Sequence, residues 1–304
     1  MKKISFLICI ALIIQEGIYA CDICGCGAGN FYMGLLPSFK SRFLGVRYHF
    51  MEYNTSLVAD PTQFSHNNYN SIELWTGWNL GKKWQILGFI PYYFNKQADD
   101  DKVTYKNGLG DITIMANYQL YQTPMIKRKR NSVWQELWVG GGVKLPSGKF
   151  SANTSDPDLT IADINAQIGT GSVDFLVNIS HYLHLNQFGL NTNVNYKINT
   201  VNGSDYKYGN RVSATSILSY KIPVGKVQVL PNLGLAYEHT SANQLQNQKV
   251  DLTGGYLLSG IAGVELYVNR VAIGFNIQGP FSQDLAEGQT NLRIRGMAHF
   301  TYVF

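Results

Sequence analysis

The sequence carries little charge for its length. Charged residues make up 15% of its 304 residues and hydrophobic residues 45%, whereas about a quarter of a typical soluble domain is charged. Proline is scarce, with 9 residues, and after the N-terminus no run approaches the roughly 18 apolar residues of a membrane-spanning helix. The net charge of +5 is modest and gives no reason to expect a nucleic-acid partner. The composition therefore disfavours both an ordinary soluble domain and a helical membrane protein.

The N-terminus has the pattern of a secretory signal peptide. Lys2 and Lys3 form a positive region, residues 5–14 a short apolar region, and residues 18–20 a cleavage site that ends on Ala20. We predict that residues 1–20 are removed during export. An exported chain without a helical span can still cross a membrane as a closed barrel, in which every backbone polar group is paired.

Aromatic residues are abundant, with 19 Tyr, 15 Phe and 5 Trp, which suits strands and the interfacial girdles of membrane barrels. The last strand, residues 291–304, carries the argument for a barrel. Every second residue back from Phe304 is apolar or aromatic as far as Leu292, and most of the intervening residues are polar or basic. A strand places these two sets on opposite faces. We expect this strand to close a barrel, because an open edge would expose an apolar face and unpaired backbone.

Eleven earlier runs have strand-like patterns, most of them with the same alternation. The fold class predicted for residues 41–304 is all-β: a transmembrane, antiparallel, up-and-down β-barrel of about twelve strands. The expected strands are 44–51, 72–79, 84–94, 111–120, 133–144, 173–180, 187–199, 211–220, 227–237, 256–268, 271–278 and 292–304.

The connections alternate in length, as periplasmic turns and extracellular loops do. Short turns are expected at residues 81–82, 185–186, 223–225 and 269–270, and longer polar loops at 53–70, 95–107, 148–169, 199–208, 240–250 and 280–288. The connection 122–132 is the exception, and its basic run 127–130 is read as a solvated turn.

Short glycine-rich motifs give a family resemblance. They are Gly108-Leu-Gly-Asp-Ile112, Leu145-Pro-Ser-Gly-Lys149 and Gly169-Thr-Gly-Ser-Val-Asp-Phe175, followed by the strand and turn of residues 189–202. Over residues 42–304 this order resembles the outer-membrane family named for the meta-pathway of phenol degradation and, more distantly, the long-chain fatty-acid transporter barrels. The resemblance implies a barrel in the outer membrane of a Gram-negative bacterium that helps small, rather apolar molecules to cross.

The segment 21–40 is a Cys- and Gly-rich leader, which looks like a variant found in exported barrels of Bacteroidetes-type bacteria. Cys21, Cys24 and Cys26 allow three interpretations. Cys21 could be acylated, although Tyr19 makes a poor lipobox; two of the thiols could form a disulfide in the oxidising envelope; or the three thiolates could bind Cu or Zn. No other cofactor is expected. The apolar residues 31–39 are read as a plug in the lumen or a segment on its rim.

Polar residues of the alternating runs should point into the barrel. Two interpretations stay open: they fill a narrow barrel as paired charges, or they line a conduction path and set its selectivity. The predicted lumen-lining residues are Arg47, His49, Glu73, Asp111, Asp174, Asn193, Asn195, Arg211, Glu238, Glu265, Arg293, Arg295 and His299.

No catalytic motif is present, and Ser180 and His181, as strand neighbours, face opposite ways. We therefore expect a non-enzymatic barrel for passage or binding of small hydrophobic or amphipathic molecules of unknown identity. The alternatives are a metal-linked envelope protein that uses the Cys cluster and a lipid-hydrolysing barrel. The expected partners are outer-membrane lipid and the barrel assembly machinery, which would recognise Phe304.

Overall fold

A computed structural model of the protein describes residues 42–56, 64–99, 103–123, 126–127, 132–151 and 167–304. The predicted signal peptide, the leader with Cys21, Cys24 and Cys26, and the proposed plug 31–39 lie outside these residues. No helix in the described ranges is long and apolar enough to cross a membrane.

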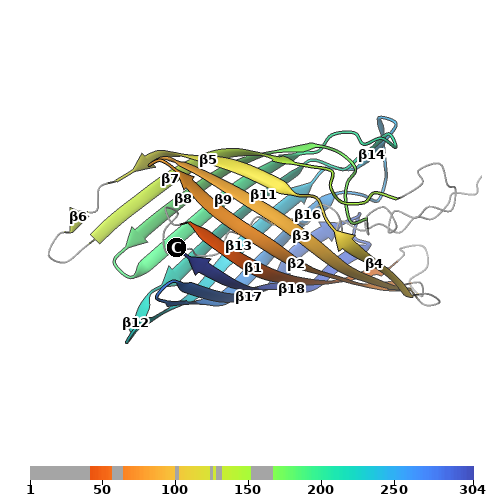
Figure 1. Cartoon of the computed structure of the whole chain (residues 1–304). Helices are drawn as coiled ribbons and strands as arrows, with labels where there is room; N and C mark the ends of the chain where they lie inside the picture. Colours follow the sequence, from red (N-terminus) through yellow and green to blue (C-terminus); the bar gives the residue numbers. More distant parts are fainter. Residues whose placement is uncertain (1–41, 57–63, 100–102, 124–125, 128–131, 152–166) are drawn as a thin grey trace, which may run out of the picture.

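The described chain is built of antiparallel strands, which run obliquely around a common axis (Figure 1). Twelve of them form a closed barrel, in which each strand pairs with its chain neighbour and β11 pairs with β13. The predicted transmembrane barrel is thus confirmed. Its strands are β1 (Phe43–Ser56), β2 (Phe64–Leu80), β3 (Trp84–Asp99), β5 (Thr113–Gln122), β7 (Ser132–Lys144), β8 (Asp174–Leu185), β9 (Phe188–Ile198), β11 (Arg211–Tyr220), β13 (Val227–Thr240), β16 (Gly255–Val268), β17 (Val271–Leu285) and β18 (Thr290–Val303).

The last strand closes the barrel on the first. β18 pairs with β1 from Phe43↔Val303 to Thr55↔Thr290, and the backbone N–H of Phe304 donates to the carbonyl of Arg42 at 2.9 Å. The prediction for the C-terminal strand is therefore correct. Figure 1 shows the C-terminus and the short strand β12 (Ile222–Val224) at one end of the barrel, here called the turn end.

The opposite end, called the loop end, differs from the prediction. Several segments expected to be loops are paired strand: β1 and β2 extend to Ser56 and Phe64, β17 extends to Leu285, and β4 (Val103–Leu109) pairs with the end of β3. Beyond the bilayer both faces of a strand meet water, so the alternation fades although the backbone pairing continues.

A bulge separates β4 from β5. Leu109 pairs with Tyr92 and Thr113 with Phe89, so three residues, 110–112, oppose two residues of β3. Such an extra residue re-aims the neighbouring side chains. Here Asp111, which belongs to a predicted motif, turns into the buried wall at the loop end.

The outward face of the barrel is apolar. Leu44, Val46, Ile114 and Phe275 are each 45–48% exposed. At the turn end aromatic rings gather in contacting pairs, among them Trp84 with Tyr118 at 4.9 Å. An exposed apolar band with an aromatic girdle is the surface of a transmembrane barrel, which places the protein in the outer membrane.

The loops of β9–β11, β13–β16 and β17–β18 pack into a small cap at the loop end. It contains a three-stranded sheet of β10 (Tyr206–Lys207), β14 (Gln244–Leu245) and β15 (Gln248–Lys249). Asn243 ties the cap together, since its Oδ1 accepts from the Gly209 N–H at 2.8 Å and its Nδ2 donates to Tyr206 Oη at 2.7 Å. The apolar residues that pack here are Phe150, Tyr206, Tyr208, Leu245 and Val250.

Candidate functional site

The interior of the barrel is the candidate functional site, because the inward face of the strands carries the buried polar and charged side chains. It also contains an apolar group that a water-filled pore would not need. This group, called the aromatic cluster, comes from six consecutive barrel strands, β1 to β8, and its residues are at most 7% exposed. The aromatic cluster consists of Phe43, Trp75, Leu87, Phe89, Met115, Trp138 and Tyr182.

A row of charged residues runs around the wall beside the aromatic cluster. Glu73 of β2 lies opposite Arg47 of β1, which lies opposite His299 of β18. The row continues through Gly274 of β17 to Glu265 of β16. Four side chains that are far apart in the sequence thus lie on one line of cross-strand neighbours.

Arg47 joins the charged row to the aromatic cluster. Its Nε donates to Glu73 Oε1 at 2.8 Å, and its guanidinium carbon lies 4.3 Å from the ring centre of Trp75 and 5.2 Å from that of Phe89. Arg47 is 1% exposed and Trp75 is fully buried. Ion pairing and cation–π contact together compensate a desolvated guanidinium.

His299 completes the row on the other side. Its Nε2 lies 2.8 Å from Glu265 Oε2 and its Nδ1 lies 3.2 Å from Thr301 Oγ1. The order Thr–His–Glu is that of a hydrolytic triad. However, Thr301 is completely buried, so its hydroxyl is not open to a substrate.

A second charged group lies nearer the loop end. Glu238 of β13 accepts from Arg211 of β11 and from Arg295 of β18, one guanidinium at each carboxylate oxygen. Arg295 Nε also donates to Gln278 Oε1 at 2.7 Å. We call Arg211, Glu238 and Arg295 the arginine–glutamate trio; it crosses the inner face of five adjacent strands.

Amides form a third polar group on β8 and β9. Asn178 donates to Asn195 at 2.6 Å, Asn195 donates to Asn193, Asn193 donates to Ser180 at 2.6 Å, and Ser180 donates to Asn178 at 3.0 Å. The four side chains close a ring of hydrogen bonds, so each satisfies the next. This ring accounts for two of the three asparagines of β9, Asn193 and Asn195.

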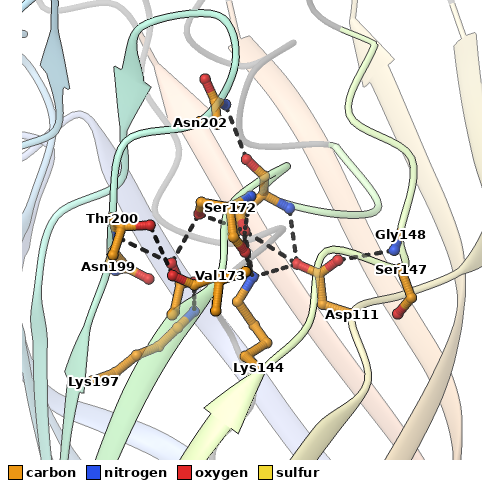
Figure 2. A network of polar contacts seen from close by, with 12 residues as sticks. Asp111, Lys144, Ser147, Gly148, Ser172, Val173, Lys197, Asn199, Thr200 and Asn202 are labelled. Atoms are coloured by element: carbon orange, nitrogen blue, oxygen red, sulfur yellow. Dashed lines mark hydrogen bonds and ion pairs between the residues drawn. The ribbon is translucent and has the colours of Figure 1, made fainter.

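The glycine-rich motifs converge at the loop end in a network here called the clasp (Figure 2). Asp111 accepts from the N–H groups of Gly148 and Thr170, both at 2.9 Å, and from Lys144 Nζ at 2.5 Å. Lys144 Nζ also lies 2.9 Å from Asp174 Oδ2. Three segments separated along the sequence are therefore held by one buried lysine and two carboxylates.

The clasp also reaches the fourth motif. Lys197 Nζ lies 3.5 Å from Asp174 Oδ2, and Asn202 Nδ2 donates to the carbonyl of Thr170 at 2.9 Å. Gly169 must be glycine here, because a Cβ atom would lie 2.4 Å from the Gly148 carbonyl oxygen. The motifs that carry the family resemblance thus build one structural joint between β5, β7, β8 and β9.

The structure brings most of the predicted lumen residues together. Nine of them are buried, and His49, Asn193 and Arg211 are half-buried on the inward face. The buried ones are Arg47, Glu73, Asp111, Asp174, Asn195, Glu238, Glu265, Arg295 and His299. The prediction for Arg293 is wrong. A register shift between Glu52 and Tyr53 turns Arg293 outward, where its exposed side chain lies 3.0 Å from Glu52, and buries Leu292 instead.

Sequence reasoning missed Lys144, Glu136 and Trp138. All three lie on β7, whose glycine run hid the phase of the strand. The cross-strand pairing Lys144↔Asp174 was the available signal, since a lysine at a strand end faces a predicted inward carboxylate. Among the described residues, no group of three or more His, Cys, Asp or Glu could hold a metal ion.

One solved structure shares this barrel fold, and a second is less similar. An outer-membrane channel from Pseudomonas putida F1 aligns with a TM-score of 0.62 and 12% identity, over 88% of this chain and 97% of that chain. The β domain of the Bordetella autotransporter BrkA aligns with a TM-score of 0.49 and 11% identity, over 87% and 100% of the chains. No curated protein matches the sequence.

The family model described as "Putative MetA-pathway of phenol degradation" matches residues 62–272. This match covers more than half of the chain and includes the clasp and most of the barrel strands. The protein therefore belongs to that family of outer-membrane β-barrels.

Proposed function

We propose that the barrel is a non-enzymatic passage for small uncharged molecules that combine an apolar ring with a polar group. The observation that carries this proposal is the aromatic cluster inside the barrel. A pore for water and ions has a polar interior, whereas the inner side of this barrel carries the buried rings of Trp75, Phe89 and Trp138.

The paired charges favour uncharged solutes. Each carboxylate of the row and of the trio has a cationic or imidazole partner: Glu73 has Arg47, Glu265 has His299, and Glu238 has two arginines. A charged solute that leaves water would find no unpaired counter-charge in these two groups, and the desolvation of an ion costs several kcal/mol.

The wall next to the aromatic cluster, on β9 and β11, offers hydrogen-bonding groups to the solute. On β9 and β11 the inward residues Asn193, Ser213 and Thr215 are small, polar and only half-buried. An amphipathic molecule could then keep its ring toward the aromatic side and its hydroxyl toward this side. Apolar walls with a few polar groups for orientation are typical of small-molecule sites.

The relatives support this direction. The description of the family refers to phenol degradation, and the aligned protein from Pseudomonas putida F1 is described as an outer-membrane channel. The buried Thr301 argues against hydrolysis by the Thr–His–Glu arrangement.

Swelling of liposomes that contain the purified barrel tests the proposal. A dihydroxybenzene should enter faster than benzoate and faster than arabinose, after subtraction of the rate in protein-free liposomes. Equal rates for the neutral aromatic solute with and without protein would refute passage. A higher rate for arabinose than for the aromatic solute would refute the proposed preference.

A further inference from the structure

We propose that Glu238 is a specificity-determining residue: by neutralising Arg211 and Arg295 it keeps the passage closed to anions. This inference rests on the proposed passage function. It concerns ions, whereas the proposed function concerns neutral solutes, so the two can fail separately.

The geometry makes Glu238 the centre of the trio. Its two carboxylate oxygens each take one guanidinium group, so no other carboxylate is needed to hold the two arginines. The side chains of Arg211, Glu238 and Arg295 are 12%, 7% and 6% exposed. A buried ion that loses its partner is left uncompensated, which is costly and attracts an opposite charge.

The trio borders half-buried polar residues of the inner wall. Glu238 pairs in register with Ser213 of β11, and Ser213 and Thr215 are the half-buried inward residues of that strand. The aromatic cluster occupies the strands from β1 to β8, whereas the trio lies on β11, β13 and β18. The half-buried residues Ser213 and Thr215 therefore lie beside the trio and away from most of the aromatic cluster.

The charges of the belt, meaning the row and the trio together, are balanced. The belt contains three arginines and three glutamates: Arg47, Arg211, Arg295, Glu73, Glu238 and Glu265. The clasp adds two lysines and two aspartates: Lys144, Lys197, Asp111 and Asp174. Two histidines, His49 and His299, lie in the same belt on β1 and β18. Rings of unbalanced charge select ions in channels; a balanced belt selects neither sign.

Because one carboxylate contacts two arginines, a substitution of Glu238 changes the charge balance at both arginines at once. Glu238→Gln keeps the size of the side chain but removes the negative charge that both guanidinium groups contact. Arg295→Gln does the reverse, because it removes one of the two positive charges that contact Glu238. The two substitutions should therefore move ion selectivity in opposite directions, which a mere loss of packing would not do.

Reversal potentials of the purified barrel in planar bilayers under a KCl gradient test this inference. Glu238→Gln should raise the chloride-to-potassium permeability ratio by about threefold or more, and Arg295→Gln should lower it. Glu238→Asp, which keeps the charge, should stay near the wild type. Glu52→Gln is the matched control, since Glu52 pairs with Arg293 on the outward face.

The result that overturns the inference is an unchanged ratio in Glu238→Gln, or a shift of the same sign in both variants. If Glu238→Gln does not fold into a heat-modifiable barrel, Arg295→Gln still tests the inference. The inference then fails if Arg295→Gln does not lower the chloride-to-potassium permeability ratio. Neutral-solute swelling in the same preparations separates the two proposals. Absence of swelling with the wild-type barrel refutes the proposed passage of neutral solutes. An unchanged chloride-to-potassium permeability ratio in Glu238→Gln refutes the role of Glu238.

Discussion

His299 and Glu265 contact each other across an intervening strand. They belong to β18 and β16, yet Nε2 and Oε2 lie 2.8 Å apart. The residue between them on β17 is Gly274, which pairs in register with both. A Cβ atom on Gly274 would lie 2.2 Å from His299 Nε2 and 2.3 Å from Glu265 Oε2. The missing side chain of Gly274 is thus what permits the buried pair.

Gly274→Ala should break this pair. Because both partners are 2% exposed, separating them leaves buried polar groups without compensation, and we expect a loss of about 3 kcal/mol in unfolding free energy. The measurement is urea unfolding in detergent or lipid. Gly279→Ala on the same strand is the control, since no atom lies within 4 Å of its Cβ position. Equal unfolding midpoints in both variants would contradict the role assigned to Gly274.

Trp138→Ala should widen the aromatic side of the passage. Trp138 is 1% exposed and its Nε1 donates to Glu136 Oε2 at 3.0 Å, so its removal leaves a cavity and costs about 3–5 kcal/mol. In liposome swelling, arabinose should enter faster and the preference for the aromatic solute should fall. Trp84→Ala is the control, because Trp84 lies on the outward face, where its ring contacts that of Tyr118 at a tilt of 58°. The same preference in both variants would show that the aromatic cluster does not face the solute path.

Asp111→Asn should loosen the clasp. Each oxygen of Asp111 now accepts from one backbone N–H group, Oδ1 from Gly148 and Oδ2 from Thr170. Asparagine replaces one of these oxygens by an NH2 group, which cannot accept, so at least one backbone hydrogen bond is lost. We expect hydrogen exchange at these two amides to accelerate about tenfold, which corresponds to ~1.4 kcal/mol. Asp251→Asn is the control, since its side chain is 82% exposed. Unchanged exchange at both amides would mean that the loop ends are held without Asp111.

The strand pattern was predictable within the bilayer and not beyond it. In the membrane one face of each strand must be apolar, so Leu44, Val46 and Tyr48 mark the phase of β1 without further information. At the loop end this constraint is absent, and the strand extension of β3 with β4 could not be separated from a loop. The outward turn of Arg293 follows from a register shift, which side-chain alternation alone does not reveal.

The partners of the interior charges were less predictable than their direction. Alternation places Arg295 and Glu238 inward, but their contact depends on strand order and tilt across the barrel. The contacts between the glycine-rich motifs also depend on strand order. Asp111, Gly148 and Thr170 are adjacent because β5, β7 and β8 are neighbouring strands of the barrel. The alternation of side chains along a strand determines which face of the sheet each side chain is on. Which side chains contact each other across strands is determined only by the strand order and register of the closed barrel.

Deletion of residues 302–304 should prevent assembly in the outer membrane. Tyr302 is exposed on the outward face, and the ring of Phe304 lies 5.9 Å from that of Trp78. The deletion also removes the Phe304 N–H bond to Arg42 and the pairing of Phe43 with Val303, so the seam opens at its turn end. It further removes the terminal aromatic residue that we propose the assembly machinery recognises. The expected result is loss of the heat-modifiable band from outer-membrane fractions.

Two further variants separate recognition from seam stability. Phe304→Ala keeps the strand and its backbone bond to Arg42, so reduced assembly in cells with normal refolding in detergent would point to recognition of the ring. Phe281→Ala removes an aromatic residue on β17 that is more exposed than Phe304, 70% against 48%, and should assemble normally. If Phe304→Ala assembles as well as Phe281→Ala, the assembly machinery does not recognise the ring of Phe304. Any assembly defect of the deletion then comes from the lost pairing between β1 and β18.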